Sequence, residues 1–221
     1  MIYADRYQLT PEQSRFLAKK KWGENVYCGM RMENRAVTFP QTKTILEGVN
    51  VPDVRLNDIQ AILNMRDAWR FLMGRSTSRP RRTISARSTA SSPATRLWSG
   101  ASCAPAMVSG TDYLPPVPQE DAVRQALVDI LSMDTTATER ALTAFCWGTR
   151  GQLFWDGNKR TSLTLANKIL LQAGAGMLTI REKHMEAFNE ALLNYYNTAD
   201  AEPLKAFLYE NAIQGLELPG A

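Results

Sequence analysis

The sequence predicts an all-α fold, a single helical domain with one short excursion into β structure. Apolar residues recur at helical spacing in one segment after another, whereas few segments show the alternation that is typical of half-buried strands. The 221 residues are 44% hydrophobic and 22% charged, ordinary proportions for a globular protein with one sizeable core.

The first half of the chain carries signals for three helices. The run Thr10–Gln13 combines a capping hydroxyl, a proline at the first helical position and a glutamine that can complete the cap, so a helix should begin there. Gly48 follows Glu47 as a helix stop and ends a second helix. A third should cover about 56–72, where apolar residues mark an amphipathic face.

The second half should hold the remaining helices and the β excursion. Helical spacing predicts helices over about 120–133, 138–147, 158–171, 180–196 and 200–213. The helix over 158–171 is largely apolar and should be the central one, with Gly174 as its stop. Between 109 and 118, turn residues followed by a Pro-rich stretch predict a hairpin arm.

Bulk composition excludes several classes of protein. No apolar run is long enough to cross a membrane, and the first residues lack the parts of a secretory signal, so a cytoplasmic location is expected. Cys28, Cys103 and Cys146 are widely spaced and should be reduced thiols. His184 is the only histidine, which excludes most His-based metal sites and any Ser-His-Asp or Cys-His triad elsewhere in the chain. We expect His184 itself to be a surface or capping residue.

The net charge of +4 is a local property of residues 75–98, which hold six of the 26 basic residues. The remaining 20 basic residues are outnumbered by 22 acidic ones, so the rest of the chain gives no reason to expect a nucleic-acid partner. Residues 75–107 are rich in Arg, Ser, Ala, Thr and Pro, a composition that is typical of a basic disordered linker; a nucleic-acid-binding linker is one alternative. We favour a frameshift in the coding sequence. Permitted codons read one base out of frame turn 83–107 into YICAINSFVARNEALEWGVLRTGNG, which has a helical apolar period.

The run 152–161, Gln-Leu-Phe-Trp-Asp-Gly-Asn-Lys-Arg-Thr, carries the most information about function. If Asn158 opens the central helix, the unpaired N–H groups and positive dipole end there suit an anion, and its side-chain amide adds a donor. Gly157 lets backbone amides curve round a phosphate. A solvated loop is the alternative that these residues alone leave open.

The charged residues of the run suit a metal-bound polyphosphate. Lys159 and Arg160 supply positive charge, and the guanidinium fork matches a phosphate edge. Asp156 is placed to hold a magnesium ion that bridges phosphate oxygens. Together these groups could position and neutralise the phosphates of a nucleotide.

The same run resembles the signature of the Fic/Doc (Fido) family, H-x-F-x-[D/E]-[G/A]-N-[G/K]-R. Every defined position after the first is matched, by Phe154, Asp156, Gly157, Asn158, Lys159 and Arg160. The run Val108–Tyr113 resembles the end of the family's target-docking flap, with Ser109, Gly110, Thr111 and Asp112 as its residues, and the out-of-frame string ends in LRTGNG, like the flap's first half. The resemblance implies a helical arm over 1–39, a Fic-type domain with a short β-hairpin flap over 40–215, and a tail over 216–221.

The family moves AMP, or sometimes another phosphate-containing group, from a nucleotide to a protein hydroxyl. The resemblance therefore implies ATP or another nucleotide and Mg2+ as cofactors, a protein substrate, and an antitoxin or inhibitory partner. Asp156 would bind the metal, Arg160 would pair with the terminal phosphates, and the nucleotide-binding set would be completed by Gly157, Asn158, Lys159 and Thr161. Lys159 is similar to the Doc branch, which transfers the γ-phosphate, and Leu163 replaces the second arginine of many AMP-transferring members.

Two positions depart from the family pattern. Gln152 stands where the family has the histidine that takes the proton of the attacking hydroxyl, and a neutral amide is no base near pH 7. Both an impaired transferase and a pseudoenzyme that only binds nucleotide or protein therefore stay open. Many members also insert the Glu of an [S/T]-x-x-x-E-[G/N] helix against the signature arginine; Glu47 is the candidate here, although Lys43 stands at its first position and a plain helix end is the alternative.

Overall fold

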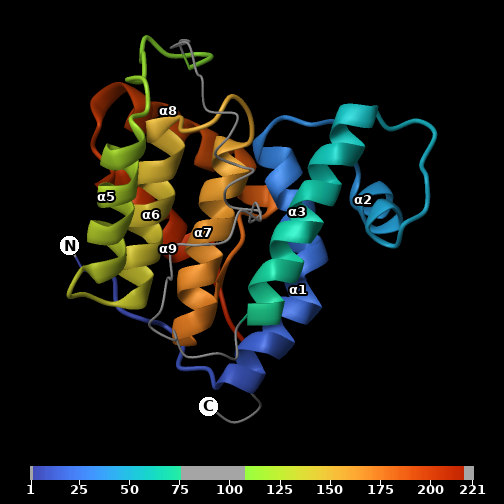
Figure 1. Cartoon of the computed structure of the whole chain (residues 1–221), viewed down its shortest axis with the longest axis horizontal. Coiled ribbons are helices and arrows are strands. Elements are labelled where there is room, and N and C mark those ends of the chain that lie inside the picture. Colours follow the sequence, from blue (N-terminus) through green and yellow to red (C-terminus); the bar gives the residue numbers. More distant parts are fainter. Residues whose placement is uncertain (1, 76–107, 217–221) are drawn as a thin grey trace, which may run out of the picture.

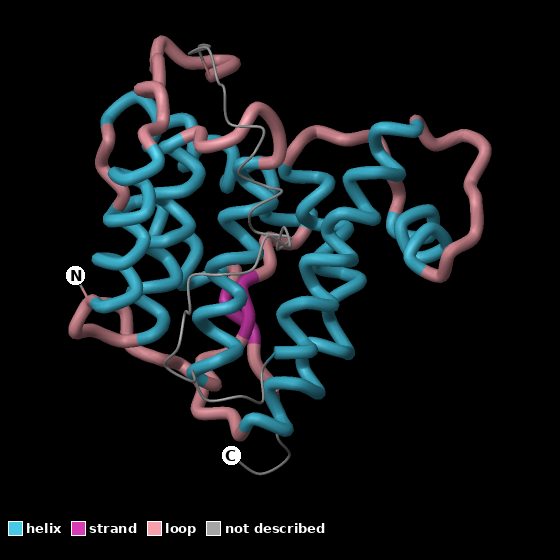
Figure 2. Tube along the Cα trace, in the orientation of Figure 1, coloured by secondary structure: helices cyan, strands magenta, loops and turns pink. Residues whose placement is uncertain are grey.

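The structure of the chain, a computed structural model, describes residues 2–75 and 108–216. Figure 1 shows that these ranges fold almost entirely into helices, which confirms the all-α prediction. The helices are α1 (Pro11–Met32), α2 (Phe39–Leu46), α3 (Leu56–Arg75), α5 (Glu120–Ser132), α6 (Ala137–Gly151), α7 (Asn158–Ala173), the 3-10 turn η1 (Glu182–His184), α8 (Met185–Thr198) and α9 (Glu202–Asn211). Two short strands, β1 (Met177–Leu178) and β2 (Ile213–Gln214), pair antiparallel beside α7 (Figure 2).

Local capping explains where several helices begin and end. Thr10 Oγ1 accepts a hydrogen bond from the Gln13 N–H at 3.3 Å, and Gln13 Oε1 accepts one from the Thr10 N–H at 2.8 Å, so α1 begins as predicted. Thr38 and Gln41 repeat this reciprocal arrangement at the start of α2. Gly174 ends α7 in the left-handed region, with φ at 74°.

Helix α7 connects two hydrophobic cores. One core lies among α6, α7, α8 and α9, and its fully buried side chains include Leu142, Phe145, Leu163 and Phe188. The other lies among α1, α2 and α3, around Trp69 and the other buried apolar side chains of these helices. Helix α1 packs along both α3 and α7, and this packing holds the end of α1 next to the start of α7. The domain boundary at residue 39 stays a prediction.

Some elements differ from the sequence-based predictions. Helix α6 runs to Gly151, beyond 147, because it continues until Gln152 turns into the left-handed region, while α8 begins only at Met185. Residues 108–119 contain no strand: the Val108 N–H donates to the Tyr113 oxygen at 3.1 Å and closes a turn. The first limb of the expected hairpin and residues 76–107 of the basic segment lie outside the described residues.

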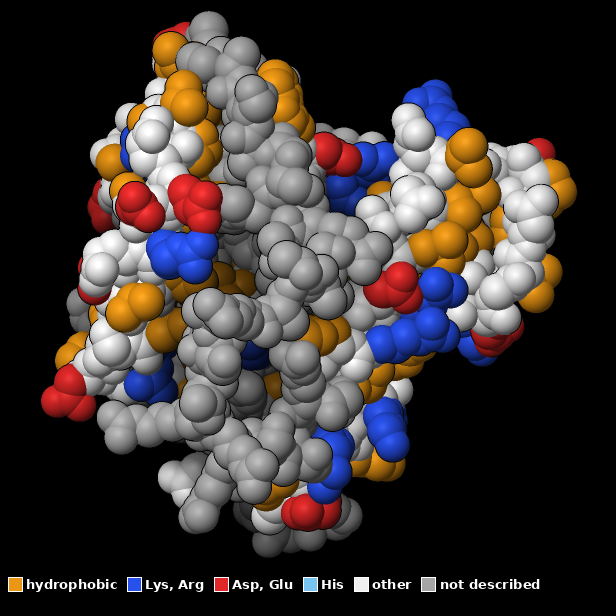
Figure 3. Space-filling view, viewed as in Figure 1, with side chains coloured by type: hydrophobic (Ala, Val, Ile, Leu, Met, Phe, Trp, Pro, Cys, Tyr) orange, Lys and Arg blue, Asp and Glu red, His pale blue; other side chains and the backbone are white. Residues whose placement is uncertain are grey.

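No described helix is long and apolar enough to cross a membrane. On the face drawn in Figure 3, the basic side chains of the described residues are interspersed with acidic ones. The absence of a nucleic-acid partner stays a prediction.

Candidate functional site

A cavity of about 500 Å³ lies where α6, α7 and α8 meet the end of α1 and the 108–118 segment. Of the residues that the sequence predicted for the site, the cavity is lined by Ser109, Gly110, Gln152, Asp156, Gly157, Asn158 and Lys159. Arg160 is buried just behind it and reaches Asp156. Thr111, Asp112 and Thr161 are not part of the lining. The Thr111 hydroxyl donates to the Val108 oxygen within its own turn, Asp112 is exposed, and Thr161 lies further along α7.

The α6–α7 loop is held by the side chain of Asn158. Its amide oxygen accepts from the Phe154 N–H at 2.8 Å, and its amide nitrogen donates to the Phe154 oxygen at 2.7 Å and to Gln152 Oε1 at 3.0 Å. Asn158 is 7% exposed, so its amide has to be satisfied within the protein. In this structure the amide of Asn158 therefore holds the loop in shape, and its donation to a phosphate stays a prediction.

The start of α7 is open to an anion. Gly157 precedes it with φ at 80°, a conformation that is strained for residues with a Cβ, and no side chain caps the helix. A Cβ at Gly157 would also lie 3.1 Å from Nη2 of Arg160. The first turn of α7 contains no acid. Its start also lacks the reciprocal Thr–Gln cap that begins both α1 and α2. The N–H groups of this uncapped first turn and the positive end of the helix dipole therefore lie at the cavity, and anion binding there stays a prediction.

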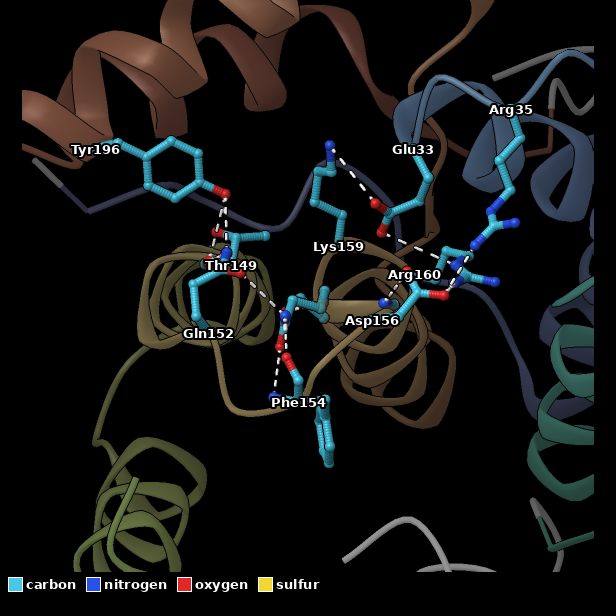
Figure 4. Close-up of polar contacts among 12 residues, drawn as sticks. Glu33, Arg35, Thr149, Gln152, Phe154, Asp156, Lys159, Arg160 and Tyr196 are labelled. Carbon is cyan, nitrogen blue, oxygen red and sulfur yellow. Dashed lines mark hydrogen bonds and ion pairs between the residues drawn. The ribbon is translucent and has the colours of Figure 1, made fainter. Parts of the chain in front are cut away.

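Charged side chains form a network beside this helix start (Figure 4). Oδ2 of Asp156 accepts hydrogen bonds from Arg160 Nη2 at 3.0 Å and from Arg35 Nη2 at 2.8 Å. The carboxylate of Glu33 lies 3.7 Å from Lys159 Nζ and 3.8 Å from Arg160 Nε. In this structure the cations expected to bind phosphate are thus paired with two carboxylates.

Glu33 and Arg35, from the end of α1, are site residues that sequence reasoning missed. Arg35 also donates to Oδ1 of Asp58 at 2.6 Å, so it bridges α3 and the α6–α7 loop. Burial disfavours the charge of Arg35, but the hydrogen bond to Asp58 and the charge of Asp156 outweigh it, so its pKa is raised. A signal for Glu33 was present: residues 29–34 read G-M-R-M-E-N, which fits the end of the inhibitory pattern with glycine in its first position.

Glu47, the predicted inhibitory residue, lies elsewhere. It is exposed at the end of α2 and lines a separate cavity with residues of α1 such as Lys20 and Trp22. Within residues 2–75 and 108–216, the carboxylates that pair with Arg160 are those of Glu33 and Asp156. Glu47 therefore does not face Arg160 in this structure, because α1 and not α2 packs along α7.

Gln152 is bound into the loop and offers no base. Its Nε2 donates to the Thr149 oxygen at 2.7 Å and to the Tyr196 hydroxyl at 3.4 Å, while its Oε1 accepts from Asn158. Burial raises the pKa of the Tyr196 phenol well above its ordinary value, so this neighbour stays protonated near neutral pH. His184 precedes α8 and packs its ring edge-on against Phe207, and it does not line the cavity.

The residues of the network fit a magnesium ion that arrives with phosphates. The side chain of Asp156 is 63% exposed and faces the helix start. No group of three His, Cys, Asp or Glu side chains among the described residues could hold a metal by itself. Magnesium is commonly held by one or two carboxylates together with substrate phosphates, so Asp156 could serve as its protein ligand.

Solved structures show the same fold. A fragment of Fic-1 from C. elegans superposes with a TM-score of 0.64 and 21% identity over 89% of this chain. A single-substitution variant of that fragment gives 0.68 and 20% over 93%, and a Fic domain-containing signalling protein from Bacteroides thetaiotaomicron gives 0.63 and 19% over 91%.

The shared fold does not extend over the whole of these proteins. The match spans 61% and 64% of the two worm chains and 85% of the bacterial one. No protein-family model matches the sequence, and no curated protein matches it either. The superposition on these solved structures shows that the chain has the fold of a Fic domain.

Proposed function

We propose that the chain is a Fido-family protein that binds a magnesium nucleotide, ATP being the expected one, and transfers AMP or phosphate to a protein hydroxyl. The observation that carries the proposal is the placement of the signature run: Asp156, Lys159 and Arg160 surround the uncapped start of α7 at a cavity of about 500 Å³. The volume lies in the range of small-molecule sites. The Fic-domain fold around it supports the same reading.

Each charged residue has a role in this proposal. Lys159 and Arg160 hold the phosphates once Glu33 has withdrawn, and the N–H groups at the start of α7 complete the anion site. Asp156 holds magnesium, which supplies charge neutralisation at the phosphates. Glu33, and not Glu47, acts as the inhibitory carboxylate, since its ion pairs occupy the cations that the phosphates need.

The transfer step proceeds without a side-chain base. The hydroxyl oxygen of the substrate forms a bond to phosphorus while the bond to the bridging oxygen breaks, releasing pyrophosphate when AMP moves or ADP when phosphate moves. The hydroxyl proton goes to water, because Gln152 cannot accept it. Loss of a general base costs about 10²–10⁴ in rate, although a loose transition state depends less on the base.

A second function, nucleotide binding without transfer, is favoured by the hydrogen bonds of Gln152. Both ends of its amide are engaged within the protein, at Asn158 and at the Thr149 oxygen. The side chain can then hold the loop in shape without contributing to chemistry. In that case the domain would act through the partner or nucleotide that it binds.

Labelled ATP distinguishes the two functions. The wild-type chain, Gln152→His and Arg160→Ala are each incubated with cell lysate and ATP labelled at the α- or the γ-phosphate, with and without Glu33→Gln. Label from α alone indicates AMP transfer, and label from γ alone indicates a kinase. Nucleotide binding that Arg160→Ala abolishes, without label on any protein, supports the second function. If the chain neither binds nucleotide nor labels any protein, both functions are contradicted.

A further inference from the structure

Arg35 is placed to control access of the metal to Asp156. We infer that Arg35 is a positioning residue that keeps the Asp156 carboxylate paired with a guanidinium, so that the magnesium ion of an incoming nucleotide has to displace it. This inference rests on the proposed function, since it concerns the same nucleotide site. The Arg35–Asp156 pair would occupy the metal ligand, just as the pairs of Glu33 with Lys159 and Arg160 occupy the phosphate-binding cations.

The guanidinium of Arg35 bridges two carboxylates of different exposure. Its Nη1 lies 2.6 Å from Asp58 Oδ1 and its Nη2 lies 2.8 Å from Asp156 Oδ2. The side chain of Asp58 is 12% exposed and that of Asp156 is 63% exposed. Asp58, on the packed helix α3, is therefore the fixed anchor, and the pairing with the loop residue Asp156 is the one that solvent and ligands reach.

Both oxygens of Asp156 are engaged in this arrangement. Oδ1 accepts from the Gly157 N–H at 2.8 Å, and Oδ2 accepts from both Arg35 and Arg160. A divalent cation at Oδ2 would lie within a few ångströms of two guanidinium groups, and like charges at such short distances repel one another. One or both arginines must therefore move when magnesium arrives.

The two arginines differ in the anionic partner that each has once Asp156 binds the metal. The guanidinium of Arg160 would pair with the phosphates of the nucleotide. Arg35 can leave Asp156 and stay paired with Asp58, so its charge is never left uncompensated. The backbone at Arg35 is held to the end of α1, because its N–H donates to the Met30 oxygen at 3.2 Å and its carbonyl oxygen accepts from Arg31 Nη1 at 3.3 Å. A swing of the side chain alone is then sufficient to open the metal position.

This arrangement makes a specific prediction about magnesium dependence. With Arg35 present, Asp156 is neutralised even without metal, so a nucleotide can bind without magnesium at a moderate loss. Without Arg35, Asp156 repels the phosphates until magnesium pairs with it. Removal of Arg35 should therefore weaken metal-free binding and strengthen magnesium-dependent binding.

The test compares the dissociation constant of a non-hydrolysable ATP analogue with excess Mg2+ and with EDTA, by calorimetry. It uses the full chain carrying Glu33→Gln, with and without Arg35→Gln. The ratio of the constant in EDTA to that in Mg2+ should be at least about tenfold larger with Arg35→Gln, an effect of the size expected for one partly screened charge pair. Arg35→Lys keeps the charge but loses the planar guanidinium fork, and should give an intermediate ratio.

Arg15→Gln is the matched control, since Arg15 lies on α1 and pairs with Glu12 far from the cavity; it should leave the ratio unchanged. An unchanged ratio in Arg35→Gln, or an equal weakening in Mg2+ and in EDTA, overturns the inference while the proposed function stands. Absence of binding in every variant, with far-UV circular dichroism showing folded protein, overturns the proposed function and the inference together.

Discussion

The carboxylate of Glu33 lies 3.8 Å from Nε of Arg160, an ion-pair distance without a hydrogen bond. Both Oε1 of Glu33 and Nε of Arg160 are buried and have no hydrogen-bond partner among the described residues. Buried polar atoms of this kind normally find a partner. The pair is therefore a loose contact that a phosphate with better geometry at Arg160 can replace.

Glu33→Gln should raise the affinity for Mg2+–ATP. The substitution removes the negative charge that competes with phosphate for Lys159 and Arg160, and an effect of about tenfold corresponds to about 1.4 kcal/mol. Calorimetry with a non-hydrolysable analogue measures it. Glu47→Gln is the matched control and should change nothing; a gain at Glu47 without one at Glu33 would reverse the assignment.

The position of Glu33 shows what a local pattern can and cannot predict. The sequence around Glu47 predicts a helix end correctly, because capping depends on a few neighbouring residues. Which helix end faces Arg160 depends on how α1 and α2 pack against α7, which is a tertiary property. Residues 29–34 match the last two defined positions of the inhibitory pattern with Glu33 and Asn34. They have glycine at position 29, where the pattern has Ser or Thr, so the sequence alone did not identify Glu33.

Gln152→Ala should destabilise the α6–α7 loop. It removes the hydrogen bonds to Asn158 and to the Thr149 oxygen, which costs about 1–2 kcal/mol in the free energy of unfolding. The loss stays moderate because Asn158 still donates to the Phe154 oxygen and the Thr149 oxygen still accepts from the Tyr196 hydroxyl. Urea unfolding measures the loss. Gln172→Ala, at an exposed position of α7, should stay within about 0.5 kcal/mol. Equal effects at the two positions would show that Gln152 does not hold the loop.

Lys205→Met should destabilise the core between α6 and α9. Nζ of Lys205 lies 2.7 Å from Oε1 of Glu139, and their side chains are 11% and 8% exposed. Removing the lysine leaves a buried carboxylate without its partner, at a cost of about 3 kcal/mol. The double variant with Glu139→Gln should lose less than Lys205→Met alone; a larger loss in the double variant would contradict this account.

The same pair predicts how stability depends on pH. Burial raises the pKa of Glu139, but the hydrogen bond and charge of Lys205, with smaller help from the Tyr3 N–H, outweigh it, so the folded-state pKa lies below the ordinary value of 4.5. The stabilisation from Glu139 is therefore fully present above the unfolded pKa and lost as pH falls through the lower folded one. Chemical unfolding between pH 7 and 3 should show a shallower acid loss for Glu139→Gln; identical slopes would contradict the shift.

Glu139 and Lys205 are separated by 66 positions, and no periodicity in the sequence pairs them. The apolar helix after Asn158 and the cap at Thr10 could be predicted, since both depend on local spacing. The engagement of Asn158 by its own loop could not, because it follows from the left-handed turn at Gln152, with φ at 44°. Charged contacts between helices therefore required the structure.

We propose that the start of α7 and Arg160 together form a phosphate site. The decisive experiment is a calorimetric titration of the Glu33→Gln chain with a non-hydrolysable Mg2+–ATP analogue, with and without Arg160→Ala. We expect saturable binding that Arg160→Ala weakens by more than about tenfold, as for loss of a charge-assisted hydrogen bond to phosphate. No binding, or binding that is the same with and without Arg160, would contradict it.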